Sequence, residues 1–355
     1  MSAGPSRTDA APASGGRGAG DAPVGSPGSP GSPASSGFPG AAPGPDAVTS
    51  PRDVAAPGRE PADAGQPALP RASVGVLAVV GVGLIGGSFA AALRAAGQVD
   101  RVIGVGRQRA TLERARELGL VDEILDAETA AAQADLIFVA TPVGAMPAVL
   151  RAMAPHLRAH AVVTDGGSTK QDVIAAAREG LGERIAQFVP GHPIAGSERT
   201  GPDAASATLY RDRQVILTPL PENVAADVAR VRAAWVACGA RVSDMPADRH
   251  DAVLGSVSHL PHLVSAAYMA QVASHADDRM DYAGSGFRDF TRIAAGSAEM
   301  WRDILLANRD AVGRELAGVQ AQLATCARLL AEGDADGLQA FLEDAAQARR
   351  GWRHD

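Results

Sequence analysis

The histidine at position 192 has the side chain and the setting for acid–base chemistry. It lies in the stretch Gly191-His192-Pro193-Ile194-Ala195-Gly196, directly after a short apolar run that reads as a strand. An imidazole there can polarise or deprotonate a substrate hydroxyl while hydride leaves the same carbon. A single histidine is more often structural, but the glycine-flanked setting and the nearby Glu198 favour a catalytic role.

A glycine-rich turn supplies a second chemical signal. The stretch Gly81-Val82-Gly83-Leu84-Ile85-Gly86 follows the apolar run 74–80 and opens a helical pattern. The first glycine permits the tight turn, the second lets a pyrophosphate approach the backbone, and the third lets helix and strand pack closely. Glycine-rich turns also form for structural reasons, but the strand–turn–helix context predicts a dinucleotide site.

The end of the expected second strand bears on which dinucleotide binds. NAD sites place a carboxylate there to bind the ribose hydroxyls, whereas this strand ends in Gly106-Arg107-Gln108-Arg109. Asp100 precedes the strand and lies at its wrong end. Arg107 and Arg109 suit a 2′-phosphate, so NADP is favoured over NAD, the alternative being two solvated loop arginines.

Two further groups have a polar character that suits a site. Ser168 and Lys170 follow an expected strand at 161–164, and Lys170 is the only lysine among many arginines. Ser168 either caps the next helix or orients His192. Arg288 and Arg292 lie one helical turn apart and can meet a carboxylated substrate, unless they form a solvated helix face.

These residues need an α/β framework to position them. Short apolar strands alternate with helical segments up to about residue 246, which predicts a parallel sheet with helices on both faces. Helical periodicity alone continues to the C-terminus. We therefore expect a Rossmann-like nucleotide-binding domain over 73–246 and an all-helical domain over 247–350. Residues 1–72 are rich in Gly, Pro, Ala and Ser, which predicts a disordered tail.

Composition excludes several classes of protein. The formal net charge is −7 and no basic cluster stands out, which argues against nucleic-acid binding. The two cysteines lack metal-ligand spacing, so we expect neither a metal site nor disulfides. There is no membrane-length apolar run and no secretory leader, and a cytoplasmic location is expected.

With these residues in hand, the chain resembles the prephenate/arogenate (cyclohexadienyl) dehydrogenase family of tyrosine biosynthesis. The matching pieces fall in family order between about 74 and 303. They are Gly83-Leu84-Ile85-Gly86-Gly87-Ser88, Ala140-Thr141-Pro142-Val143, Thr164-Asp165 with Ser168 and Lys170, Gly191-His192-Pro193-Ile194-Ala195-Gly196, Ser258-His259-Leu260-Pro261-His262 and Gly286-Phe287-Arg288-Asp289-Phe290-Thr291-Arg292.

The resemblance implies a homodimer that oxidatively decarboxylates prephenate to 4-hydroxyphenylpyruvate, with hydride transferred to NADP or NAD. It also implies roles for the site residues. His192 would take the proton of the C4 hydroxyl, and Ser168 would hold His192 or that hydroxyl. Arg292 would bind the ring carboxylate, with Glu198 and Asp289 forming an ionic gate around it. His262 would face the substrate side chain and Lys170 would lie in the substrate site, while Thr141 and Pro142 would lie near the nicotinamide.

Other functions remain open at this stage. An arogenate or dual-specificity cyclohexadienyl dehydrogenase would share the same motifs, and His262 only weakly favours the pyruvyl side chain of prephenate. A β-hydroxyacid dehydrogenase or imine reductase would lack the loop that carries His192. A non-catalytic NADPH sensor would need no combination of His192, Ser168 and Arg292.

Overall fold

The computed structural model describes residues 74–352, apart from 198 and 276. The expected tail over 1–72 and the site residue Glu198 therefore lie outside the described residues. Within the described part, no helix is both long and apolar enough to cross a bilayer.

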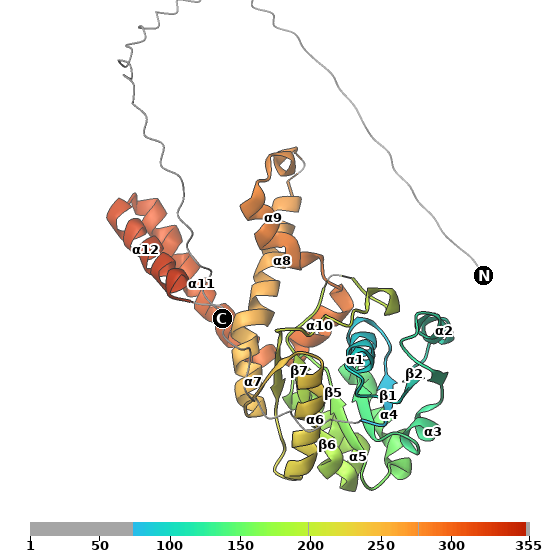
Figure 1. Ribbon diagram of the computed structural model, residues 1–355. Helices are drawn as coiled ribbons and strands as arrows, with labels where there is room; N and C mark the ends of the chain where they lie inside the picture. Colours follow the sequence, from blue (N-terminus) through green and yellow to red (C-terminus); the bar gives the residue numbers. More distant parts are fainter. Residues whose placement is uncertain (1–73, 198, 276, 353–355) are drawn as a thin grey trace, which may run out of the picture. The chain divides into compact units, whose positions relative to one another are not determined.

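A six-stranded parallel sheet forms the centre of the nucleotide-binding region (Figure 1). Its strand order is β3-β2-β1-β4-β5-β6. The chain therefore adds β2 and β3 on one side of β1 and then β4, β5 and β6 on the other side, which makes the gap between β1 and β4 a switch point. Ligands bind at such a switch point, outside the carboxyl ends of the strands. The strands are β1 (Val76–Val80), β2 (Arg101–Val105), β3 (Glu123–Ile124), β4 (Leu136–Val139), β5 (Val162–Asp165) and β6 (Phe188–Val189).

Helices cover both faces of this sheet, as expected from the sequence. Leu77 and Val79 of β1 belong to one buried cluster, while Ala78 and Val80 belong to another, because successive strand residues face opposite sides. The first cluster includes side chains of α1 (Leu84–Ala95), α2 (Arg109–Glu117) and α6 (Ala225–Ala237), and the second includes side chains of α3 (Ala127–Ala131), α4 (Met146–Met153) and α5 (Gln171–Leu181).

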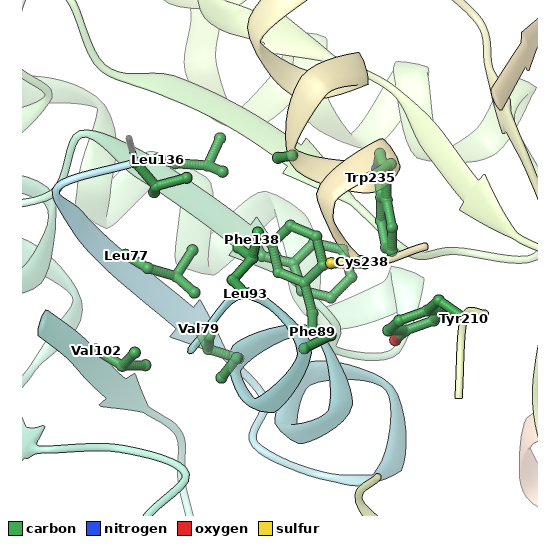
Figure 2. Packing of buried hydrophobic residues seen from close by; sticks show 14 of the residues in the cluster. Leu77, Val79, Phe89, Leu93, Val102, Leu136, Phe138, Tyr210, Trp235 and Cys238 are labelled. Atoms are coloured by element: carbon green, nitrogen blue, oxygen red, sulfur yellow. The ribbon is translucent and has the colours of Figure 1, made fainter. Parts of the chain in front are cut away.

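Aromatic side chains fix α1 on the sheet (Figure 2). The Phe89 ring of α1 lies 4.5 Å, centroid to centroid, from both Phe138 and Trp235. The Tyr210 hydroxyl donates a 2.6 Å hydrogen bond to the Ile85 carbonyl in the first turn of α1. These contacts hold the N-terminus of α1 in place at the edge where a ligand would bind.

A second, smaller sheet departs from the expected single strand series. β7 (Gly191–Pro193) pairs antiparallel with β8 (Gln214–Leu217), and β8 pairs parallel with β9 (Arg241–Asp244). The segment 215–217 therefore does not continue the parallel sheet. The loop expected around His192 is instead a short strand, in which His192 lies opposite Ile216.

The remainder of the described chain is helical, as predicted. The last strand ends at Asp244 and α7 begins at Ala247, while the domain boundary at 246 stays a prediction. A π-helical turn, Gly255–His259, joins α7 to α8. The helices are α7 (Ala247–Leu254), α8 (Leu260–Ala273), α9 (Ser285–Thr291), α10 (Ala298–Ala307), α11 (Arg309–Glu332) and α12 (Ala335–Gly351).

Candidate active site

A groove of about 480 Å³ lies at the carboxyl ends of β1, β2 and β4. It is the switch point of the strand order, where dinucleotides bind in folds of this type. Five of the cofactor-binding residues expected from the sequence line it, namely Gly81, Gly83, Arg107, Thr141 and Pro142. Leu84, Ile85 and Gly86 form the first turn of α1 beside it.

The glycines have the individual environments that a dinucleotide turn requires. Gly81 has φ of 94°, and a Cβ there would lie 2.6 Å from the Ala140 carbonyl oxygen. A Cβ at Gly86 would overlap the Gly81 carbonyl oxygen, so helix and strand could not approach. A Cβ at Gly83 would meet nothing within 4 Å. Since Gly83 is not required by packing, the open space beside it fits a pyrophosphate group.

The N-terminus of α1 has no side-chain cap. Its first backbone N–H groups point out of the helix without intrahelical acceptors, and the helix dipole adds a partial positive charge there. An anionic pyrophosphate satisfies both features. The residues present therefore fit NAD or NADP.

The two arginines after β2 differ in their surroundings. Arg107 is exposed at the groove and makes no ion pair with any described residue. Arg109 is engaged in α2, where it hydrogen-bonds Glu113 one helical turn away. Of the two arginines, Arg107 is therefore the one available for a cofactor phosphate.

His192 is buried at the carboxyl edge of the parallel sheet, with 8% of its surface exposed. The amide of its neighbour Gly191 donates a 2.9 Å hydrogen bond to the carboxylate of Asp165 at the end of β5. Because β5 pairs with β4, the carboxylate that holds this segment lies one strand away from the end of β4, after which Thr141 and Pro142 line the groove. The His192 segment and the cofactor groove thus lie at the same edge of the parallel sheet.

Lys170 also binds the segment that contains His192. Its ammonium group lies 2.5 Å from Asp165 and donates a 2.8 Å hydrogen bond to the Gly191 carbonyl. The Lys170 side chain is fully buried. Its contacts favour a role in positioning the His192 segment over the direct substrate contact expected from the sequence.

His192 is linked to two residues of α7 that sequence reasoning did not single out. Its Nδ1 lies 2.8 Å from Nε2 of His250, and His250 Nδ1 lies 2.9 Å from the Asp251 carboxylate. All three side chains are buried. Adjacent His and Asp residues in the middle of a helix carry no distinctive pattern, which is why the sequence alone did not reveal them.

The buried surroundings keep His192 neutral. Burial lowers the pKa of His192 well below its usual value of 6.5, and electrostatic interactions with His250, Lys170 and His259 lower it further. A neutral imidazole is the form that can accept a proton at neutral pH. The geometry and the charge state of His192 thus both suit a general base.

Asp251 also takes the capping role considered for Ser168. Its two carboxylate oxygens accept hydrogen bonds from the backbone amides of Lys170 and Gln171, at 2.8 and 2.9 Å, where α5 begins. Within the described chain the Ser168 side chain hydrogen-bonds neither to His192 nor to the start of α5. Ser168 is half-buried between these elements, and its backbone contacts the ring of His259.

A third polar group lies at the start of α8. His262 stacks on Trp301 with ring centroids 3.5 Å apart, and its buried Nδ1 has no hydrogen-bond partner among the described residues. Gly296 adjoins this pair, since a Cβ there would lie 3.2 Å from the His262 ring. An unpartnered buried nitrogen is costly, so His262 is a group that a bound ligand would satisfy.

Arg292 starts the short turn Arg292–Ala295, which leads directly into Gly296. This brings the expected carboxylate-binding arginine into the neighbourhood of His262. Arg292 and Asp289 are both exposed, and no ion pair joins them among the described residues. The expected ionic gate therefore stays a prediction, since Glu198 is not described.

A dinucleotide groove and a neutral buried histidine at the same carboxyl edge of the sheet define the class: this chain is a dehydrogenase that uses NAD or NADP. Comparison with known families narrows the class. Residues 89–244 match the nucleotide-binding domain of prephenate dehydrogenase, and residues 246–344 match its dimerization domain. The chain belongs to the prephenate dehydrogenase family.

Individual relatives agree with this assignment. The chain is 36% identical to a cyclohexadienyl dehydrogenase of Zymomonas mobilis, over 79% of this chain and 96% of that protein. A prephenate dehydrogenase from Aquifex aeolicus, solved with hydroxyphenyl propionate and NAD+, superposes with a TM-score of 0.73 at 32% identity, covering 78% of this chain and 98% of that one. An arogenate dehydrogenase from Synechocystis superposes with a TM-score of 0.66 at 31% identity, covering 78% and 99%.

Proposed function

We propose that the chain oxidatively decarboxylates prephenate to 4-hydroxyphenylpyruvate, with NADP+ preferred over NAD+ and His192 as the general base. The observation that carries this proposal is the buried, neutral His192 at the carboxyl edge of the sheet, the same edge at which the dinucleotide groove opens. The bound cofactor supplies a hydride acceptor. The chain's own residues orient the substrate and accept one proton.

The proton acceptor in this proposal is Nε2 of His192, because Nδ1 is already engaged with His250. As Nε2 takes the proton of the C4 hydroxyl, the electron pair of the broken O–H bond forms the carbonyl and drives hydride departure from C4. Loss of CO2 from C1 then makes the ring aromatic. The free-energy gain from aromatisation leaves the protein chiefly with orientation and this one proton transfer.

Substrate orientation is assigned to the start of α8 and the turn after α9. The unpartnered Nδ1 of His262 faces the substrate side chain in this proposal. Arg292, exposed near that histidine, supplies a guanidinium for the ring carboxylate, which it can bind through two parallel hydrogen bonds. Ser168 contributes its hydroxyl to the C4 hydroxyl of the substrate, since its side chain makes no hydrogen bond with a described residue.

The preference for NADP rests on Arg107. It lies at the groove, it makes no ion pair with a described residue, and the strand end carries no carboxylate for ribose hydroxyls. A guanidinium at that position matches a 2′-phosphate dianion.

We also propose that the protein is a homodimer formed through its helical region. Several large apolar side chains are exposed there, and one protomer leaves them uncovered. They include Val257, Tyr268, Tyr282, Phe290, Leu306 and Leu323. Light scattering at micromolar concentration is expected to give the mass of two chains, and a single-chain mass would contradict the proposal.

A second candidate is a dehydrogenase with broad specificity for cyclohexadienyl acids. The resemblance to the Zymomonas mobilis cyclohexadienyl dehydrogenase over nearly its whole length favours this alternative. The test is NAD(P)H formation in a two-by-two design, with prephenate or arogenate and with NADP+ or NAD+. Prephenate with NADP+ is expected to react fastest, comparable rates with both acids would favour the second candidate, and cofactor binding without any turnover would favour a sensor.

A further inference from the structure

The strongest unassigned feature is the buried row of side chains that runs from His192 through His250 to Asp251. The contacts are 2.8 Å between the imidazoles and 2.9 Å from His250 to the carboxylate. His250 has no exposed surface and Asp251 has 3%. The two residues come from α7, whereas His192 comes from β7, so the row joins the nucleotide-binding region to the helical region.

The direction of each hydrogen bond follows from the carboxylate. Burial raises the pKa of Asp251, but hydrogen bonds from His250, Gln171 and Lys170 outweigh it and hold that pKa below its usual range. Asp251 is therefore ionised at neutral pH and can only accept. His250 must donate its Nδ1–H to Asp251, and in an imidazole with one ring hydrogen Nε2 is then an acceptor.

The same logic then determines the state of His192. Its Nδ1 faces the acceptor nitrogen of His250, so Nδ1 carries the hydrogen and donates it. Nε2 of His192 is left with its lone pair, and it is the nitrogen free to meet the substrate. Without His250 this contact would no longer favour hydrogen on Nδ1, and the opposite tautomer, with hydrogen on Nε2, offers the substrate no lone pair at Nε2.

We propose that His250 and Asp251 are positioning residues, which hold His192 in the tautomer with an unprotonated Nε2 and take over its positive charge during turnover. This inference rests on the proposed role of His192 as base. When the substrate O–H bond breaks, its proton bonds to His192 Nε2. The Nδ1 proton of His192 then moves to Nε2 of His250, and the resulting imidazolium lies against the Asp251 carboxylate.

The charges around His192 explain why this transfer is favourable. His192 faces the ammonium group of Lys170, which disfavours a second positive charge on its own ring. His250 contacts a carboxylate directly, which stabilises an imidazolium. An imidazole pair of this kind accepts the substrate proton without leaving an uncompensated buried charge.

The test compares His250→Phe with His250→Gln. Phenylalanine fills a similar volume but offers no hydrogen bond, so kcat is expected to fall by about 10²-fold while KM changes by less than about threefold. Glutamine can donate to Asp251 and accept from His192 but cannot take up a proton, so its kcat is expected to lie between those of His250→Phe and the wild type. The matched control is His156→Phe, the same exchange at an exposed histidine, and it should leave both constants unchanged.

A spectroscopic measurement keeps the proposal testable even where a variant fails to fold. Histidine ¹⁵N chemical shifts distinguish the two imidazole tautomers, and the His192 signals are those missing from the spectrum of His192→Asn. The wild type is expected to show His192 protonated on Nδ1, and protonation on Nε2 would overturn the proposal.

The outcomes also separate this inference from the function on which it rests. If His192→Asn keeps full turnover, both the base and its positioning pair are refuted. If His192→Asn is inactive while His250→Phe matches the wild type in kcat, only the positioning role is overturned. Equal losses of kcat in the phenylalanine and glutamine variants would show that His250 has only a structural role.

Discussion

The ammonium group of Lys170 lies 2.5 Å from a carboxylate oxygen of Asp165, and neither side chain has any exposed surface. The same ammonium group binds the Gly191 carbonyl, while the other Asp165 oxygen binds the Gly191 amide. One buried ion pair thus holds both polar groups of the residue that precedes His192.

Replacement of Lys170 by Met is expected to lower the free energy of unfolding by about 3–5 kcal/mol, because Asp165 would remain buried without its counter-charge. Urea denaturation measures this loss. The matched control is Arg178→Met, which breaks the exposed Arg178–Glu222 pair and should leave the unfolding midpoint almost unchanged. Equal midpoints for both variants would contradict the account of Lys170.

Two alanine substitutions in the glycine turn should have different consequences. Gly83→Ala meets no atom within 4 Å, so the variant should fold normally but bind NADP at least about tenfold more weakly. Gly86→Ala overlaps the Gly81 backbone and should lower thermal stability as well. Thermal melts and cofactor titrations of the two variants check this. Normal NADP binding by Gly83→Ala would show that the pyrophosphate lies elsewhere.

Charge reversal at Arg107 tests the cofactor preference. Arg107→Asp should raise the Kd for NADP by about 10²-fold and change the Kd for NAD much less, because only NADP carries the 2′-phosphate. Arg109→Asp is the matched control, since Arg109 is engaged with Glu113 in α2. Equal weakening of both cofactors by Arg107→Asp would remove this residue from the phosphate site.

Stability should fall as the pH drops below about 6.5. Burial lowers the pKa of His259 from 6.5 to about 4, so the unfolded chain binds a proton in this window that the folded chain does not. The stabilisation is complete above pH 6.5 and is lost progressively as the pH approaches 4. The pKa difference of His259 between the folded and the unfolded chain corresponds to a loss of on the order of 3 kcal/mol in the free energy of unfolding. The lowered pKa of His192 adds to this loss in the same direction.

The measurement is the free energy of unfolding at pH 7 and pH 4.5 for the wild type and His259→Gln. The variant lacks the titrating group, so its loss of stability between the two pH values should be smaller than that of the wild type. An identical loss in both proteins would show that His259 does not titrate abnormally.

Much of the framework follows from local sequence. The alternation of apolar strands and helices predicts the parallel sheet, and the glycine turn predicts the groove, because both signals lie within a few adjacent residues. The three-residue strand that holds His192 was not predictable, since Gly191, His192 and Pro193 show no periodicity. Its pairing with β8 becomes visible only in the folded chain.

The side-chain contacts of His192 also could not be predicted from the sequence alone. His250 lies 58 residues further along the chain, on a helix assigned to another region. Lys170 was singled out by its rarity, but its burial against Asp165 depends on how the segments after β5 and β6 meet. Chemistry that depends on contacts between distant segments has no local sequence signal.

The most direct test of the account is NADPH formation from prephenate by the wild type and His192→Asn, measured side by side with substrate binding. Asparagine keeps a polar side chain of similar size but cannot act as a base at neutral pH. The account predicts rapid turnover by the wild type, a loss of kcat of about 10²-fold or more in the variant, and nearly unchanged prephenate binding. Turnover by His192→Asn at the wild-type rate would contradict it.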